Sequence, residues 1–227
     1  MARIFIVWFT VIAGIFVSAI ANEYCKITCK FDDTVYKHTM CLYPSPNPGP
    51  TCVKPHDQGF TDAEKNAVVQ KHNELRKKVA SGMETRGNPG PQPPAVNMPD
   101  LTWDDELATI AQRWANQCTY GHDNCITVKR FNVGQNIAYD PNHDATVEKL
   151  IQKWYDEVKL HDRKTVSRFQ FDMKTGHYTQ IVWADTTKIG CGKIKYTDSK
   201  GWIGLYLVCN YGPTGNYINK PIYKIKK

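Results

Sequence analysis

The segment KIGCGKIKYTDSKGWIGLYLVCNY, residues 188–211, decides the fold class. Two runs that contain aliphatic and aromatic residues, 188–196 and 202–211, flank the turn-forming residues 197–201, which is the pattern of a β-hairpin. Antiparallel pairing around this turn would bring Cys191 within about one register step of Cys209. The spacing alone therefore predicts a disulfide bond across the hairpin.

Three amphipathic helices are expected upstream of this hairpin, because apolar residues recur there at helical spacing. Their expected bounds are Thr61 to Gly82, Thr102 to Cys118, and Thr146 to about Leu160. The first begins with a capping box formed by Thr61 and Glu64. Strand patterns also occur at residues 131–139 and at residues 176–183, where the alternation is regular. Since helices and strands do not alternate strictly, the sequence predicts an α+β layered domain with an antiparallel sheet.

The first 21 residues indicate the compartment. Arg3 precedes an apolar run from Ile4 to Val17, and Ala19-Ile20-Ala21 supplies small residues for cleavage. This is the pattern of a secretory signal peptide, and it is too short for a comfortable membrane span; an uncleaved N-terminal anchor is the alternative. No later segment reaches the length of a membrane-spanning helix. We expect a secreted, extracellular protein that begins near Asn22.

Composition excludes several classes of function. The 227 residues carry a net charge of +7, 41% hydrophobic and 11% aromatic residues, which excludes a wholly disordered chain. The positive charge is spread along the sequence without a basic block. It permits weak contact with anionic surfaces, but it does not indicate a nucleic-acid partner.

Eight cysteines lie in the expected mature chain: Cys25, Cys29, Cys41, Cys52, Cys118, Cys125, Cys191 and Cys209. In an oxidising compartment this even number implies four disulfides, for which the sequence alone allows 105 connectivities. A zinc site is the weaker alternative, because no Cys-x-x-Cys pair faces a second one. Residues 22–59 hold four of the cysteines and no sustained periodicity, so they are expected to form an arm that is stapled to the main domain of residues 60–227.

Few residues remain as candidates for chemistry. The sequence has no Gly-x-Ser-x-Gly motif, no unpaired cysteine in the expected mature chain and no His-Glu-x-x-His motif. The candidates are His122, Glu157 on the buried face of the third helix, and His177; His72 is more consistent with a structural role. An internal hydrogen-bond network is one interpretation of the three, and a metal or acid/base site is the other.

Several motifs together resemble the CAP superfamily, which contains cysteine-rich secretory proteins, antigen 5 and plant pathogenesis-related proteins. These motifs are GHYTQIVW at 176–183, LVCNYGPTGN at 207–216, KHNELR at 71–76, WANQC at 114–118 and VGQNI at 133–137. The N-terminal arm and the segments ETRG at 84–87 and GPQPP at 90–94 are similar to insect antigen 5, the venom allergen 5 group. The resemblance covers essentially residues 22–227.

The resemblance implies a three-layer α-β-α sandwich around a central, largely antiparallel sheet, with a disulfide-stapled N-terminal arm. It also implies the disulfides Cys25–Cys41, Cys29–Cys125, Cys52–Cys118 and Cys191–Cys209. The last of these agrees with the spacing argument.

The family's central cleft holds two histidines and two acidic residues, which carry over to His122, His177 and Glu157, with the fourth position at Gln135. Many relatives have Glu at that fourth position. A carboxamide cannot ionise or act as a general base. The resemblance therefore implies no strong metal site, with His122 and His177 as weak candidate ligands, and no catalytic residues.

The function that the resemblance implies is that of a secreted venom or salivary antigen 5-type protein, an allergen and not an enzyme. It implies no cofactor, host antibodies as partners and a monomer. The alternative is an extracellular carrier of lipid or sterol, and a hydrolase is the least favoured class. The channel activity of some reptile relatives depends on an additional cysteine-rich domain, and no cysteine follows Cys209 here.

Overall fold

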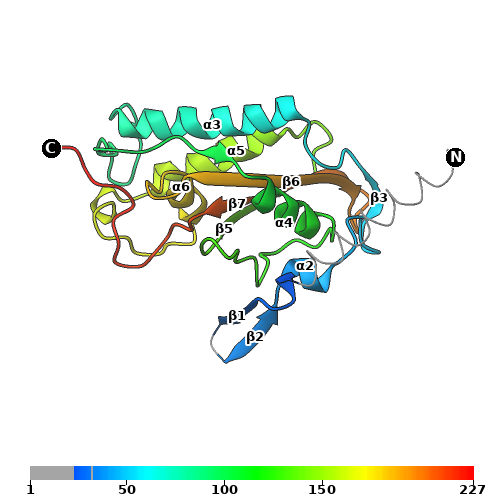
Figure 1. The fold of residues 1–227 in the computed structure, drawn as a ribbon. Coiled ribbons are helices and arrows are strands. Elements are labelled where there is room, and N and C mark those ends of the chain that lie inside the picture. The colour runs from blue at the N-terminus through cyan, green and yellow to red at the C-terminus, as the bar shows by residue number, and fades with distance from the viewer. Residues whose placement is uncertain (1–22, 32) are drawn as a thin grey trace, which may run out of the picture.

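A computed structural model describes residues 23–31 and 33–227 (Figure 1). The expected signal peptide, residues 1–21, lies outside the described residues. The central sheet has the strand order β3-β6-β7-β5, and β4 pairs with β6 beside this path. Its strands are β3 (Val53–His56), β4 (Thr102–Trp103), β5 (Gly134–Asp140), β6 (Lys188–Thr197) and β7 (Ile203–Gly212). All pairings are antiparallel except that between β4 and β6.

The β6–β7 hairpin forms the middle of this sheet. Cys191 lies directly opposite Cys209 in the register, and the two are joined by a disulfide. Alternate residues of β7 belong to different cores: Leu207 and Cys209 pack with one layer, whereas Tyr206 and Val208 pack with the other. Because both faces of β7 are covered, its sequence is almost continuously apolar.

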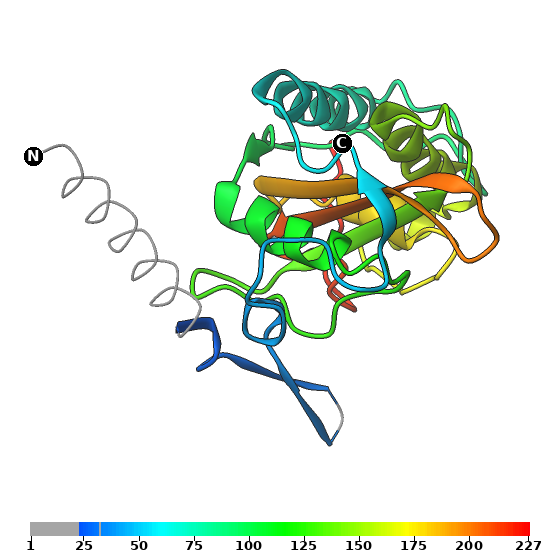
Figure 2. The same ribbon diagram turned by 90° about the vertical axis from the view of Figure 1, so that its right-hand side faces the viewer.

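Helices cover both faces of the sheet (Figures 1 and 2). On one face lie α3 (Asp62–Ala80), α5 (Val147–Asp156) and α6 (Gly176–Ile181), and on the other lies α4 (Asp105–Ala115). The α4 backbone packs directly on β6 at Gly190, where a Cβ atom would lie 2.2 Å from the Ala108 nitrogen. Only glycine permits this approach. The predicted α+β three-layer fold is confirmed.

The N-terminal arm is more regular than its sequence suggests. It contains a hairpin of β1 (Thr28–Phe31) and β2 (Thr34–Lys37), followed by a short helix, α2 (Thr39–Leu42). This hairpin projects from the body of the protein (Figure 2). The arm then contributes β3 to the edge of the central sheet.

Three disulfides hold the arm: Cys25–Cys41, Cys29–Cys125 and Cys52–Cys118. With Cys191–Cys209, they are the four pairs that the resemblance implies, and no described cysteine is free. Backbone contacts add to them, because Gly49 N donates to Asn116 O at 2.7 Å. The arm is therefore tied to the end of α4 both covalently and by hydrogen bonds.

Two expected elements differ in the structure. Residues 176–183 were expected to form a strand, but residues 176–181 form α6. Four consecutive residues of α6, 178–181, are buried. The alternation of residue types in the sequence therefore does not correspond to a strand with one exposed and one buried face. The second helix does not start at Thr102, because Thr102 pairs with Lys188 in β4. Asp104 caps the helix instead, its side chain accepting from Leu107 N at 3.0 Å.

The third helix closely follows its expected bounds. Thr146 is the N-cap of α5, and α5 continues into a 3-10 helix, η1 (Glu157–Leu160). A second 3-10 turn, η2 (Arg163–Thr165), follows. Glu157 therefore lies at the junction of α5 and η1, where its side chain is 19% exposed.

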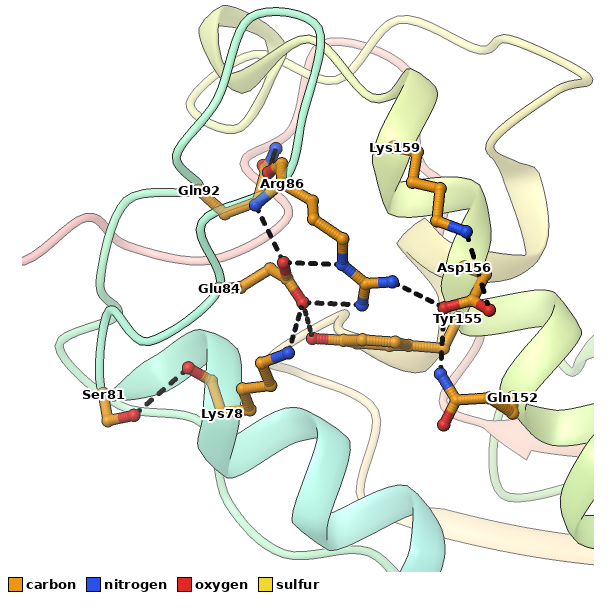
Figure 3. Close-up of polar contacts among 9 residues, drawn as sticks. All are labelled: Lys78, Ser81, Glu84, Arg86, Gln92, Gln152, Tyr155, Asp156 and Lys159. Carbon is orange, nitrogen blue, oxygen red and sulfur yellow. Dashed lines mark hydrogen bonds and ion pairs between the residues drawn. The ribbon is translucent and has the colours of Figure 1, made fainter.

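The loop after α3 is fastened to α3 and α5 through Glu84, which is fully buried (Figure 3). Glu84 accepts hydrogen bonds from both Arg86 Nε (2.9 Å) and Arg86 Nη2 (2.8 Å). Tyr155 Oη donates to it at 2.8 Å, and Lys78 Nζ lies 3.1 Å away. Arg86 also pairs with Asp156 at 2.6 Å. We call these five residues the Glu84 network.

Candidate functional site

His177 and Glu157 form the first half of the site. His177, near the start of α6, has its Nδ1 atom 2.6 Å from Glu157 Oε1. Glu157 Oε2 accepts the backbone N–H groups of His177 (3.0 Å) and Tyr178 (3.1 Å). Both carboxylate oxygens are therefore engaged, and they fix the start of α6 as well as the imidazole ring. The ring also stacks on Trp154, with 5.9 Å between ring centroids.

His122 and Gln135 form the second half. Gln135 Oε1 accepts from Asp123 N at 3.0 Å and lies 3.2 Å from His122 Nδ1. Gln135 Nε2 donates to Asn210 Oδ1 at 3.0 Å, and Asn210 Nδ2 donates to Leu107 O at 3.3 Å. The carbonyl of Leu107 thus fixes the orientation of Asn210, which in turn fixes that of Gln135.

This relay determines the tautomer of His122. Because Gln135 Oε1 is an acceptor, His122 Nδ1 carries the hydrogen and Nε2 keeps its lone pair. Burial lowers the pKa of His122, and the hydrogen bond to Gln135 offsets only part of that effect. A neutral amide cannot stabilise an imidazolium as a carboxylate would. His122 therefore presents a neutral acceptor nitrogen.

A buried network links α3 to the same region. His72 Nδ1 donates to Val68 O at 2.8 Å, so His72 Nε2 accepts from Tyr211 Oη at 2.9 Å. Asn136 Nδ2 then donates to Tyr211 Oη (3.3 Å) and to His177 O (3.2 Å). Burial lowers the pKa of His72 to about 4. His72 is a neutral core histidine that supports the site without lining it.

The two halves face a cleft of about 350 Å³. Its lining includes His122, Gln135, Asn136, Phe171, Met173 and His177. Glu157 is not part of the lining, since it lies behind His177. Within the described part of the chain, no hydrogen bond joins the His122 pair to the His177 pair. Phe171 and Met173, which are 58% and 82% exposed, form an apolar rim.

The donor set of the cleft limits its chemistry. Nowhere in residues 23–31 and 33–227 do three His, Cys, Asp or Glu side chains gather closely enough to hold a metal ion. None of the described serines, Ser45, Ser81, Ser167 and Ser199, lines the cleft. The described lining offers two imidazoles and an apolar rim, which can bind a ligand.

Sequence reasoning named four site residues, and the structure brings them together as two pairs. It missed Asn210 and Asn136, which orient Gln135 and α6, and the rim residues Phe171 and Met173. The register could have identified Asn210, because it lies directly opposite Gln135 between β5 and β7. A polar residue on a buried strand requires such a partner.

Among residues 23–31 and 33–227, no helix is both long and apolar enough to cross a bilayer. The disulfides are consistent with an extracellular protein.

Comparison with known proteins gives a consistent result. The profile of the cysteine-rich secretory protein family, CAP, matches residues 69–211. Venom allergen 3 of Solenopsis invicta is 55% identical over 230 aligned residues, covering 98% of this chain and 97% of the relative. Venom allergen 5.02 of Dolichovespula maculata is 51% identical, covering 91% and 96%. The crystal structure of NaASP2 with Zn2+ has a TM-score of 0.61 and 29% identity, covering 76% of this chain and 90% of that one.

Proposed function

Because the chain belongs to the CAP family of cysteine-rich secretory proteins, we propose that it is a secreted, antigen 5-type component of venom or saliva that binds rather than catalyses. Sensitised hosts recognise it by antibody, as the names of its relatives indicate for those proteins. The main domain is assigned to residues 60–227 and the stapled arm to residues 22–59.

This proposal is supported by the hydrogen bonds of Glu157 and Gln135, the polar side chains next to the two cleft histidines. Both oxygens of Glu157 form hydrogen bonds, to the His177 ring and to the backbone of α6. The side-chain amide of Gln135 forms hydrogen bonds to Asp123 and Asn210. The carboxylate of Glu157 is thus not free to act as a general base. His122 Nε2 and His177 Nε2 are free, but nucleophilic catalysis also needs a nucleophile next to such a base. The described lining offers neither a serine nor a cysteine to activate.

Catalysis can be tested directly with the mature protein and a panel of ester and peptide substrates. We expect no turnover above that of His177→Ala, which removes the imidazole from the cleft. Hydrolysis by the wild type that His177→Ala abolishes would overturn the proposal.

The cleft is expected to bind zinc weakly. Among the described lining residues, only His122 Nε2 and His177 Nε2 are free nitrogen ligands, whereas strong zinc sites use three or four protein ligands. Gln135→Glu restores a negative charge that would offset the desolvation of the metal. In calorimetric titrations with zinc, we expect Gln135→Glu to bind at least tenfold more tightly than the wild type. Equal affinities would show that the carboxamide does not limit metal binding.

A carrier of lipid or sterol is the alternative function, favoured by the exposed apolar rim at Phe171 and Met173. Mass spectrometry of organic extracts from natively purified protein distinguishes a lipid carrier from a protein that carries no lipid. A stoichiometric lipid that disappears in a Phe171→Ser, Met173→Ser variant would identify a carrier.

Recognition by antibodies can be tested with sera from donors sensitised to Solenopsis venom. We expect immunoglobulin E in these sera to bind the native protein, and preincubation with the native venom to inhibit that binding. Sera from unexposed donors are the control.

A further inference from the structure

The fold gathers positive charge that the sequence spreads out. Residues 159–174 and 217–227 together carry nine Lys or Arg and two Asp, a net side-chain charge of +7. This equals the net charge of the whole chain, since the other 200 residues carry 20 basic and 20 acidic side chains. We call these two segments the basic end.

The two segments lie side by side at one end of the protein (Figure 1). Backbone hydrogen bonds join them, from Phe169 N to Lys220 O (2.8 Å) and from Ile222 N to Val166 O (2.8 Å). The basic end lies opposite to β3 and the turn between β6 and β7. The protein is therefore electrostatically polarised along its length.

The cations of the basic end are mostly unpaired. Only Lys159 lies within ion-pair distance of a described carboxylate, at 4.0 Å from Asp156. The other eight have no such partner: Arg163, Lys164, Arg168, Lys174, Lys220, Lys224, Lys226 and Lys227. Elsewhere in the described chain, eleven of nineteen cations form ion pairs. Clustered, unpaired cations create a potential that attracts anions over about a Debye length.

The same end exposes apolar side chains. Of the fifteen large hydrophobic side chains that the described residues expose, six lie in these 27 residues: Leu160, Phe171, Met173, Tyr217, Ile218 and Ile225. The two segments thus hold about three times as many exposed large hydrophobic side chains as their share of the described residues would predict. Clustered exposed apolar groups on a protein surface indicate an interaction site.

We propose that the basic end docks on an anionic phospholipid surface, with its cations against the lipid headgroups and its exposed apolar side chains inserted at the boundary of the acyl chains. Peripheral membrane binding combines these two contributions. A linear sulfated polysaccharide or a nucleic acid would use the cations alone and would leave Phe171, Met173 and Ile218 in water. The apolar side chains therefore favour lipid.

Docking in this orientation has a geometric consequence. Phe171 and Met173 belong both to the basic end and to the rim of the cleft. The mouth of the cleft would thus face the lipid, with His122 and His177 behind it. This inference does not depend on the proposed function, because it rests on the surface and not on what the cleft binds.

The test is flotation of the mature protein with phosphatidylcholine vesicles that contain or lack 30% phosphatidylserine. We expect binding only to the anionic vesicles. The triple variant Lys164→Gln, Lys174→Gln, Lys220→Gln should bind about a hundredfold more weakly, at about fivefold per cation removed. The matched control is Lys37→Gln, Lys54→Gln, Lys200→Gln, which has the same net charge but is altered away from the basic end, and should bind within about twofold of the wild type.

The apolar contribution is tested separately with Phe171→Ser, Met173→Ser, whose side chains are exposed and whose loss leaves the core intact. We expect this variant to bind anionic vesicles at least tenfold more weakly. The proposal is overturned if the protein does not bind anionic vesicles, or if both triple variants lose binding equally. It is also overturned if the apolar variant binds like the wild type while heparin retains the protein through the same three lysines, which would identify a polysaccharide site.

Discussion

Arg76 places a positive charge inside the protein without a carboxylate to balance it. Its guanidinium donates to the carbonyl oxygens of Pro99 (2.7 Å), Ile181 (2.8 Å) and Trp183 (2.7 Å), and no described carboxylate lies within ion-pair distance. Burial lowers its pKa to about 10, so the charge persists at neutral pH. One side chain on α3 thereby satisfies carbonyls from α6, from the segment that follows α6 and from the segment that precedes β4.

Replacing Arg76 by Met should be severely destabilising, because several buried carbonyls would lose their donors. We expect the free energy of unfolding to fall by about 3 kcal/mol or more. Urea denaturation followed by circular dichroism measures this change. The neighbouring exposed Lys77→Met is the control and should change stability by no more than about 0.5 kcal/mol; similar midpoints for the two variants would contradict the role of Arg76.

At the scale of elements, hydrophobic periodicity predicted the helices that have one buried and one exposed face. The three long helices follow from helical periodicity, with the capping box at Thr61 and the start of the third helix at Thr146 correctly identified. The hairpin, whose strands are buried on both faces, was predicted from the turn residues between two apolar runs. Periodicity failed at α6, whose residues are buried on several sides and whose first N–H groups bind Glu157, 20 residues earlier in the chain. Such a partner is invisible in a local pattern. Gln135 was identified through the resemblance to the family, whereas Asn210, which orients it from another strand, was missed for the same reason.

The Glu84 network makes the attachment of the loop to α3 and α5 depend on pH. Burial alone would raise the pKa of Glu84, but the hydrogen bonds from Arg86, Tyr155 and Lys78 outweigh burial and lower it to about 2. A carboxyl group whose pKa is lower in the folded than in the unfolded state stabilises the folded state. For Glu84 this stabilisation is complete at pH values above the pKa of the unfolded state, which is near 4.5. That contribution is lost as the pH falls from about 4.5 to about 2.

We therefore expect the wild type to lose about 3 kcal/mol of stability over that range through Glu84. In Glu84→Gln this pH-dependent part should disappear, and the variant should be less stable than the wild type at pH 6. Urea denaturation at pH 6, 4 and 2.5 checks both statements. Glu74→Gln, at an exposed position on α3, is the control; if Glu84→Gln kept the full pH dependence, the carboxylate would not be its source.

At the scale of the whole molecule, the arm depends on covalent attachment. Apart from β3, the elements that the structure describes in the arm are the β1–β2 hairpin and the one-turn helix α2. A two-stranded hairpin is marginal by itself. Cys52–Cys118 closes a separation of 66 residues between the arm and the end of α4. The arm is therefore the part of the fold that most needs its disulfides.

A Cys52→Ser, Cys118→Ser variant should lose about 2–5 kcal/mol of stability, and its arm should be cleaved first in limited proteolysis. Mass spectrometry of the early fragments locates the cuts. A Lys54→Gln variant with intact disulfides is the control. An arm as resistant as that of the wild type would mean that the backbone contacts near Gly49 suffice to hold it.

The position of β7 in the sheet has a consequence for how the protein is made. This strand pairs with both β5 and β6, yet it is the last of the described helices and strands in the chain. During synthesis, α3, α4 and α5 emerge with their apolar faces uncovered and wait for the strand on which they pack. The central sheet can therefore close only once residues 203–212 are available, and the apolar faces of the helices made earlier stay uncovered until then.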